Sequence, residues 1–246
     1  MRRMLDKYRG QIGYKTADVI YRLVKRARLP RNRKVYEPGA IEIALDKVPG
    51  WRGPKDKPIS MLNFFLIRDE SSDAEIGRFL FNDQQSFSNP KLLPECVVER
   101  EVGEQEIYPI RIPVRNEIMR FYTKFLDKIC EERDDPTTYG ETVHADADAI
   151  YHTIDRLMSG KRIAVSKLKD PKYKDRIKAN IDNPDKLAEI LRDSAREEEV
   201  VAEARRIAEA CKFNPDYAEE FVRWMMDVTL RIVEVEYLRQ RLDFKG

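Results

Sequence analysis

A pair of basic residues stands eleven positions apart in the stretch IDRLMSGKRIAVSK, which covers residues 154–167. Its members are Arg156 and Lys167. Eleven residues of an α-helix, at about 100° each, end within roughly 20° of where they began, so both cations point the same way. The small residues Ala149 and Gly160 share that face and leave volume beside the helix. We therefore expect both cations to reach an enclosed anionic ligand.

Other ionisable residues fall inside stripes that helical periodicity marks as buried. Arg9 projects among the apolar residues of the first predicted helix, whereas Arg26 near its end falls outside that stripe. Burying a charge is costly, and ion pairing within a bundle explains any single case. A shared polyanionic ligand explains all of them together. The set comprises Arg9, Arg156, Lys167, Asp193, Glu197 and Glu234.

Cations grouped around carboxyl groups describe a pocket for a small molecule with two carboxylates and further polar oxygens. Arginine binds a carboxylate through two parallel hydrogen bonds, and lysine delivers a compact charge to one oxygen. The sequence has no GxxxxGK[ST] loop, no GxGxxG after a strand pattern, and no Ser-His or Cys-His arrangement. These absences argue against phosphoryl transfer, hydride transfer and acyl transfer. The chemistry that remains is electrostatic.

Composition limits the partners of the chain. Its 246 residues are 42% hydrophobic, enough for a substantial core, and its formal charge of +2 creates no bulk field for nucleic acid or anionic lipid. The three cysteines form no CxxC pair, and no apolar run approaches the ~20 residues of a membrane span. His144 and His152 share no ligand spacing. We expect a cytoplasmic protein without metal, cofactor, nucleic-acid or membrane partners.

The elements that must position these residues are helical. Asn183 before Pro184, and Asn214 before Pro215, each place an N-cap residue ahead of proline at the first helical position. The region 82–111 is rich in Asn, Pro and Ser, and the segment EIYPIRIP (106–113) at its end is the one stretch with an extended character; 170–183 is a lysine-rich link. We predict an all-α, single-domain helical bundle over 1–246 with its active site between helices. The predicted helices cover 4–29, 58–81, 113–133, 144–169, 184–211 and 215–242.

Several blocks of the sequence, taken in order, resemble the eukaryotic-type, all-helical chorismate mutases. They are YRGQIGYKTADVIYRLVKRARL followed by VYE near the start, YGETVHADADAIYHTIDRLMSGKRIAVSK at 139–167, DSAREEEVVAEARRIAEACKFNP, and the closing VEVEYLRQRL. The resemblance covers nearly the whole chain. It implies rearrangement of chorismate to prephenate, a step in phenylalanine and tyrosine biosynthesis, without a cofactor.

The resemblance also implies roles for individual residues. Arg9 and Arg156 would hold the two carboxylates of chorismate, and Lys167 would contact a carboxylate and the ether oxygen. Glu197 would accept a hydrogen bond from the substrate hydroxyl. A protonated Glu234 would donate to the ether oxygen, and low-dielectric surroundings favour that protonated form. Catalysis would then consist of holding the reactive conformer and stabilising negative charge on that oxygen.

Two positions of the pocket depart from the family pattern. Asp193 stands where the eukaryotic enzymes often have Asn, so its carboxylate would repel a dianion unless it is otherwise engaged. Leu230, one turn before Glu234, replaces a common Thr and is counted among the substrate-binding positions. The neighbouring Thr229 is expected to point about 100° away from it.

Family members are often homodimers with a Trp or Tyr effector site. In this chain Arg78 matches one of a characteristic arginine pair, but Gly77 replaces the other. Gly140 is followed by Glu141 where a serine is usual. The resemblance thus implies a homodimer, whereas Arg78, Gly140 and Glu141 preserve the effector pattern only in part.

Two other functions are compatible with the sequence. A lyase acting on isochorismate and releasing pyruvate would need a similar pocket for a dianion. A non-catalytic helical scaffold or RNA-binding adaptor would instead use RLVKRARLPRNRK at 22–34, which has seven basic residues. Salt-sensitive RNA affinity would be the mark of the adaptor.

Overall fold

The computed structural model describes residues 2–53 and 55–243, and for residues 2–7, 9 and 243 it describes the backbone alone. The predicted site residue Arg9 therefore has its side chain outside the described part. Every regular element of the described ranges is helical, which confirms the all-α prediction. Two compact units divide the chain: Met1–Val24 with Glu104–Val114 and His152–Gly246, and Lys25–Gly103 with Arg115–Tyr151. The single domain over 1–246 stays a prediction.

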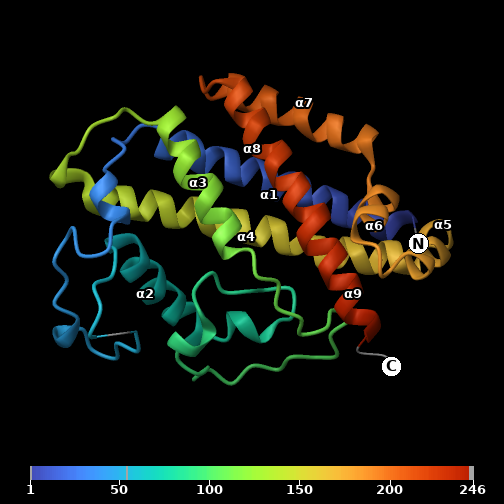
Figure 1. Cartoon of the computed structure of the whole chain (residues 1–246), viewed down its shortest axis with the longest axis horizontal. Helices are drawn as coiled ribbons and strands as arrows, with labels where there is room; N and C mark the ends of the chain where they lie inside the picture. The colour runs from blue at the N-terminus through green and yellow to red at the C-terminus, as the bar shows by residue number, and fades with distance from the viewer. Residues whose placement is uncertain (1, 54, 244–246) are drawn as a thin grey trace. The chain divides into compact units, whose positions relative to one another are not determined.

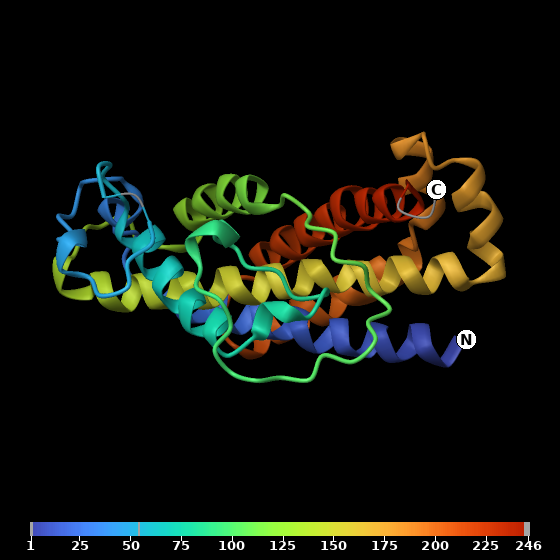
Figure 2. The same cartoon turned by 90° about the horizontal axis from the view of Figure 1, so that it is seen from below.

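The first unit contains most of the long helices. In both views α1 and the C-terminal part of α4 run side by side (Figure 1 and Figure 2), and Lys15 Nζ lies 2.9 Å from Asp155 Oδ2 across them. Helices α7 and α8 pair through Arg223, which donates to both Glu198 carboxylate oxygens at 2.9 Å. The helices with residues in this unit are α1 (Arg2–Arg26), α4 (Tyr139–Lys169), α5 (Pro171–Ala179), α6 (Pro184–Leu191), α7 (Ser194–Ala210), α8 (Pro215–Val228), a π-helical segment (Thr229–Glu234) and α9 (Val235–Asp243).

The predicted helix over 184–211 is wrong as one continuous element, because the chain breaks at Arg192 and Asp193. Arg192 is extended, with φ −65° and ψ 139°, so α6 ends before it. Asp193 accepts a hydrogen bond from the backbone N of Arg196 at 3.3 Å and thereby caps α7. An aspartate at this position satisfies one of the unpaired N–H groups at the start of a helix. Helical periodicity of the apolar residues continues across this break, so the sequence pattern alone does not reveal where α6 ends.

The lysine-rich link over 170–183 is also different from the prediction, since most of it forms α5. Asp170 accepts a hydrogen bond from the backbone N of Lys172 at 2.9 Å, and Pro171 takes the first helical position. The two predicted caps at Asn183 and Asn214 are confirmed, with backbone N–H donors at 3.0 and 2.9 Å. An N-cap residue followed by proline depends only on neighbouring residues, so helix starts of this kind can be recognised without tertiary contacts.

The segment EIYPIRIP forms no strand within the described residues. Side chains of the first unit form hydrogen bonds with the backbone of this segment instead. Lys161 donates from Nζ to the carbonyl of Ile110 at 2.7 Å, and the backbone N of Tyr108 donates to the hydroxyl of Tyr237 at 3.0 Å. This segment is therefore anchored by α4 and α9 rather than by a neighbouring strand.

The second unit contains α2 (Met61–Glu75), α3 (Arg115–Ile129) and the N-terminal part of α4. The helix predicted over 58–81 ends earlier, because Gly77 has a positive φ of 76° that interrupts it. The short 3-10 helices of this unit are Arg33–Tyr36, Leu45–Lys47, Arg78–Leu80, Pro90–Leu92 and Pro136–Thr138. No helix in the described ranges combines the length and apolar character required to cross a bilayer.

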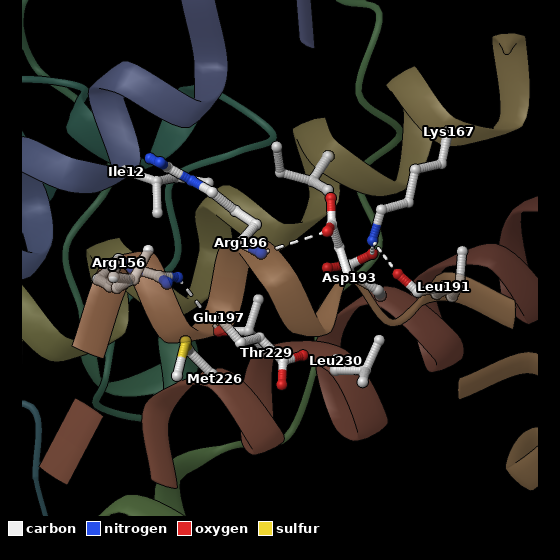
Figure 3. A pocket seen from close by; sticks show the side chains of 13 residues that line it. Ile12, Arg156, Lys167, Leu191, Asp193, Arg196, Glu197, Met226, Thr229 and Leu230 are labelled. Carbon is white, nitrogen blue, oxygen red and sulfur yellow. Dashed lines mark hydrogen bonds and ion pairs between the residues drawn. The ribbon is translucent and has the colours of Figure 1, made fainter. Parts of the chain in front are cut away.

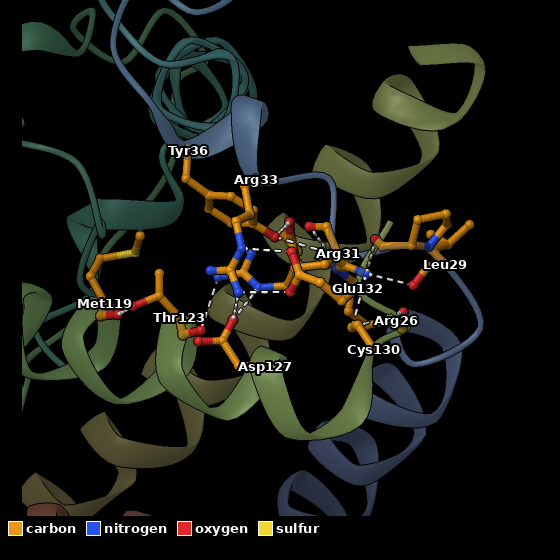
Figure 4. Close-up of polar contacts among 12 residues, drawn as sticks. Arg26, Leu29, Arg31, Arg33, Tyr36, Met119, Thr123, Asp127, Cys130 and Glu132 are labelled. Atoms are coloured by element: carbon orange, nitrogen blue, oxygen red, sulfur yellow. Dashed lines mark hydrogen bonds and ion pairs between the residues drawn. The ribbon is translucent and has the colours of Figure 1, made fainter. Parts of the chain in front are cut away.

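Arg26 lies in the interior of the second unit, which contradicts its expected place outside the buried stripe (Figure 4). Its Nε donates to Asp146 at 2.6 Å, and its Nη1 donates to the carbonyl of Pro30 at 3.0 Å. Tyr122 donates to the same Asp146 carboxylate at 2.7 Å. A helical wheel sorts positions by apolar neighbours, so it misses a cation whose burial depends on acceptors far away in the sequence.

Candidate active site

One cavity of the first unit brings together five of the six predicted charged residues (Figure 3). Arg156 and Lys167 extend into it from α4, on opposite sides of the view. The rest of the lining comes from the end of α6, the start of α7, the end of α8, the π-helical segment and Ile12 of α1. Its predicted members are Arg156, Lys167, Asp193, Glu197, Leu230 and Glu234. The structure thus brings together residues that are up to 78 positions apart, from Arg156 to Glu234.

Lys167 and Glu234 form a buried ion pair in this cavity. Lys167 Nζ lies 2.7 Å from Glu234 Oε2, and each side chain is 7% exposed. The same Nζ donates to the carbonyl of Leu191 at 2.7 Å. Leu191 is the last residue of α6, so the break between α6 and α7 supplies an acceptor that orients the lysine. Burial raises the pKa of Glu234, while the Lys167 ammonium opposes that rise.

Arg156 has a different environment, because it is 4% exposed and has no ion-pair partner among the described side chains. Its Nε donates to Thr16 Oγ1 at 2.9 Å, and its Nη1 donates to Thr229 Oγ1 at 3.3 Å. Desolvation lowers its pKa to about 10, although the charge of Glu234 opposes this. Burying a guanidinium without an ion-pair partner costs free energy, and such a group is well suited to binding an anionic ligand.

The π-helical segment changes which residues of the last helix face the cavity. In an α-helix, residues five apart lie roughly 140° from each other. The i→i+5 hydrogen bonding of a π-turn brings such residues closer in register, and π-turns often occur at functional sites. Thr229, five positions before Glu234, accordingly lines the cavity together with Leu230. The expectation that Thr229 points away from the pocket is wrong.

Gly160 serves packing rather than ligand volume, which corrects the prediction from its small size. A Cβ built on it would lie 2.8 Å from the Thr229 methyl and 3.1 Å from Val233 Cγ1. Thus α4 and the π-helical segment approach so closely at this point that only glycine fits. The space beside Gly160 is filled by the opposite helix.

The start of α7 places three more charged groups at the cavity. Asp193 uses its carboxylate to cap the helix, which gives an acidic side chain a structural role at this position, while its charge stays at the cavity. Glu197 is 25% exposed at its side chain, and Arg192 Nε lies 4.0 Å from it. Arg196 also lines the cavity and pairs with Glu199 at 2.7 Å. Sequence reasoning missed Arg196; its position three residues after Asp193, which places both on one side of the helix start, is the signal that could have indicated it.

The three residues of the predicted effector pattern lie in the second unit. Arg78 Nη1 is 2.6 Å from Asp73 Oδ2. Gly140 and Glu141 belong to the first turn of α4, and a Cβ on Gly140 would meet nothing within 4 Å. Arg78 is therefore paired with an acidic neighbour, and the surface beside Gly140 is open.

Comparison with known proteins finds no matching family model. The chain is similar to a chorismate mutase of Schizosaccharomyces pombe, with 28% identity covering 97% of this chain and 96% of that protein. It is similar to the cytosolic chorismate mutase 2 of Zea mays, with 26% identity and coverage of 92% and 90%. The fold matches that of AtCM1 with tyrosine bound in its allosteric site, with a TM-score of 0.84, 22% identity and coverage of 98% and 97%.

Proposed function

We infer that this chain is a chorismate mutase of the all-helical eukaryotic type, an isomerase that converts chorismate to prephenate on the route to phenylalanine and tyrosine. Chorismate mutases from a fungus and a plant match more than nine-tenths of its length. The observation within the molecule that supports this function most is the buried Arg156, which has no ion-pair partner in the described part of the chain and shares its cavity with the Lys167–Glu234 pair.

Arg156 is proposed to bind one carboxylate of chorismate. Its hydrogen bonds to Thr16 and Thr229 occupy one N–H on Nε and one on Nη1. One N–H on Nη1 and both on Nη2 remain for a ligand, and a guanidinium can offer two of them in parallel to a carboxylate. Arg9 is proposed to bind the second carboxylate, on the basis of the resemblance alone.

Lys167 and Glu234 are proposed to flank the ether oxygen of the substrate. In the rearrangement the ether C–O bond breaks while a C–C bond forms, and negative charge grows on the oxygen. Lys167 can donate to that oxygen as an ammonium, and Glu234 can donate only in its protonated form. Donors already in place for a developing charge lower the barrier without reorganisation.

Glu197 is proposed to accept a hydrogen bond from the substrate hydroxyl, and Leu230 to supply an apolar contact. Both line the cavity beside Asp193. With these contacts the protein would select the reactive conformer of a flexible substrate. Holding reacting atoms in a near-attack arrangement removes an entropic part of the barrier.

We also propose that the enzyme works as a cytosolic homodimer without strong Trp or Tyr control. AtCM1 carries tyrosine in an allosteric site, and the Zea mays relative is named cytosolic. Here Asp73 neutralises Arg78, and Gly77 has a positive φ with Cys96 Sγ 2.8 Å from where a Cβ would lie. An arginine at position 77 would therefore be strained. Activity assays with and without added Trp or Tyr test the part of this proposal that concerns effector control.

The RNA-binding alternative loses its main support because the basic run at 22–34 is largely neutralised. Five of its seven cations form ion pairs with acidic residues of the second unit. The pairs are Lys25–Asp148, Arg26–Asp146, Arg31–Asp127, Arg33–Glu132 and Lys34–Asp134. Such pairs leave little free positive charge for phosphate binding.

The decisive experiment follows the absorbance of chorismate during incubation with the purified protein. We expect loss of chorismate with formation of prephenate and no release of pyruvate. Pyruvate released from isochorismate, with chorismate left intact, would identify the lyase instead. A protein that consumes neither compound would overturn the proposed function.

A further inference from the structure

Thr16 of α1 contacts the buried Arg156 through its hydroxyl. It is 3% exposed, and its Oγ1 lies 2.9 Å from Arg156 Nε. The hydroxyl proton is committed elsewhere, since Oγ1 donates to the carbonyl of Ile12 at 2.8 Å, one turn earlier in the same helix. The threonine oxygen therefore meets Arg156 as an acceptor alone.

Thr229 repeats this arrangement from the other side of the guanidinium. Its Oγ1 accepts from Arg156 Nη1 at 3.3 Å and donates to the carbonyl of Met225 at 2.7 Å. Two helices thus present one hydroxyl oxygen each to the same arginine. Neither oxygen has a formal charge, which distinguishes both contacts from the ion pairs of Lys167 and of Arg26.

The neutrality of these partners has a chemical consequence. A carboxylate at the same place would fix the guanidinium equally well, but it would neutralise the charge that a ligand carboxylate needs. A hydroxyl accepts one hydrogen bond, restricts rotation about the last bonds of the side chain, and leaves the cation uncompensated. The remaining N–H groups of Arg156 then keep one orientation before the ligand arrives.

We propose that Thr16 is a positioning residue that holds Arg156 by a neutral hydrogen bond, so that the guanidinium stays charged, unpaired and aimed at one substrate carboxylate. This inference rests on the proposed function, because it names the geometry by which the same pocket receives chorismate. It extends that function to a residue of α1 that does not line the cavity.

The register of α1 supports this role. Seven residues at about 100° each end within roughly 20° of the start, so positions 9 and 16 share one face of the helix. That face contains Ile12, which lines the cavity. Thr16 thus lies on the side of α1 that faces the pocket.

The test compares Thr16→Val, which keeps the shape and removes the hydroxyl, with Thr16→Ser, which keeps the hydroxyl. The substrate carboxylate is present in the ground state and the transition state alike, so a misaligned Arg156 weakens both and the effect falls on KM. A hydrogen bond to a charged group corresponds to a factor of roughly 10 to 100 in affinity. We expect KM for chorismate to rise by about that factor in Thr16→Val, with kcat changed less than about threefold.

Thr16→Ser should restore the KM, and the product prephenate should bind more weakly to Thr16→Val in the same proportion. Thr123→Val is the matched control, because Thr123 donates to the carbonyl of Met119 in the same way and has no contact with Arg156. A merely structural hydroxyl would lower the melting temperature and the active fraction, and hence kcat, without changing KM.

The inference is overturned if Thr16→Val has the KM of the wild type, or if Thr16→Ser is as impaired as Thr16→Val. Failure of the proposed function gives a different result, because the wild-type protein itself would then leave chorismate unchanged. Melting curves and kinetics are recorded for the wild type and each variant of the full chain.

Discussion

Lys167 Nζ and Glu234 Oε2 lie 2.7 Å apart in a setting where each side chain is almost completely removed from water. The pair links α4 to the π-helical segment, and the Leu191 carbonyl accepts a second hydrogen bond from the lysine. Burial favours the neutral carboxyl and the ammonium favours the carboxylate, so the proton on Glu234 is sensitive to any ligand that changes this balance.

Replacing Glu234 by Gln should extend activity to higher pH. The pKa of Glu234 is raised in the folded protein, so the donating form is lost as pH rises through that raised value. Glutamine donates at any pH, and kcat/KM of Glu234→Gln should therefore stay level where that of the wild type declines.

By linkage, Glu234 also lowers the folding stability as the pH rises above the ordinary pKa of a glutamate, because the folded state binds more protons than the unfolded state. Identical pH profiles would remove Glu234 from the ether-oxygen role.

Replacing Arg156 by Met should separate activity from stability. Arg156 is proposed to bind a carboxylate through two charge-assisted hydrogen bonds, each corresponding to a factor of roughly 10 to 100 in affinity, so we expect kcat/KM to fall by at least about 100-fold. Since Arg156 is buried and forms no ion pair with the described side chains, an apolar side chain of similar length should leave the free energy of unfolding unchanged or higher. Urea unfolding and chorismate kinetics measure the two effects.

The control for this substitution is Arg162→Met on the same helix. Arg162 lies over the ring of Tyr8 at 5.8 Å and does not line the cavity. Its replacement should leave KM and kcat near those of the wild type. Near-normal turnover in Arg156→Met would contradict the proposed carboxylate site.

Replacing Gly160 by Ala should destabilise the fold and displace Thr229. The new Cβ would stand 2.8 Å from the Thr229 methyl, within a contact that cannot open without moving the π-helical segment. Overpacking of this kind costs about 1–3 kcal/mol in unfolding free energy, measurable in urea. Gly13→Ala in α1 is the control, since its Cβ meets nothing within 4 Å and alanine is the better helix former. Equal stability of both variants would refute the tight packing.

Two substitutions of Asp193 should separate the effect of helix capping on stability from the effect of its charge on substrate binding. Asp193→Asn keeps an oxygen for the backbone N of Arg196, so its unfolding free energy should remain close to that of the wild type. Asp193→Ala removes the cap and should cost about 1 kcal/mol. Because asparagine removes a negative charge beside a dianionic ligand, KM should fall in Asp193→Asn. A higher KM there would mean that the carboxylate assists binding.

Local signals in the sequence identified much of this architecture. The caps at Asn183 and Asn214 depend on one side chain and a backbone N–H two or three residues away, so they form wherever the helix forms. The alignment of Arg156 with Lys167 follows from the pitch of a single helix. Residue spacing alone therefore assigns both cations to one cavity, which both of them line.

Contacts between distant segments decided the rest. Helical periodicity could not show that Arg26 is buried, because its acceptors lie up to 120 residues away. It could not show that Thr229 turns into the pocket, because the π-helical segment adds a residue to a turn where α4 presses against it at Gly160. The hydrogen bond from Arg156 Nε to Thr16 Oγ1 joins residues that are 140 positions apart in the sequence. Residue types and spacing determined which charges belong together, but the orientation of each one depends on packing between helices that the chain brings together only on folding.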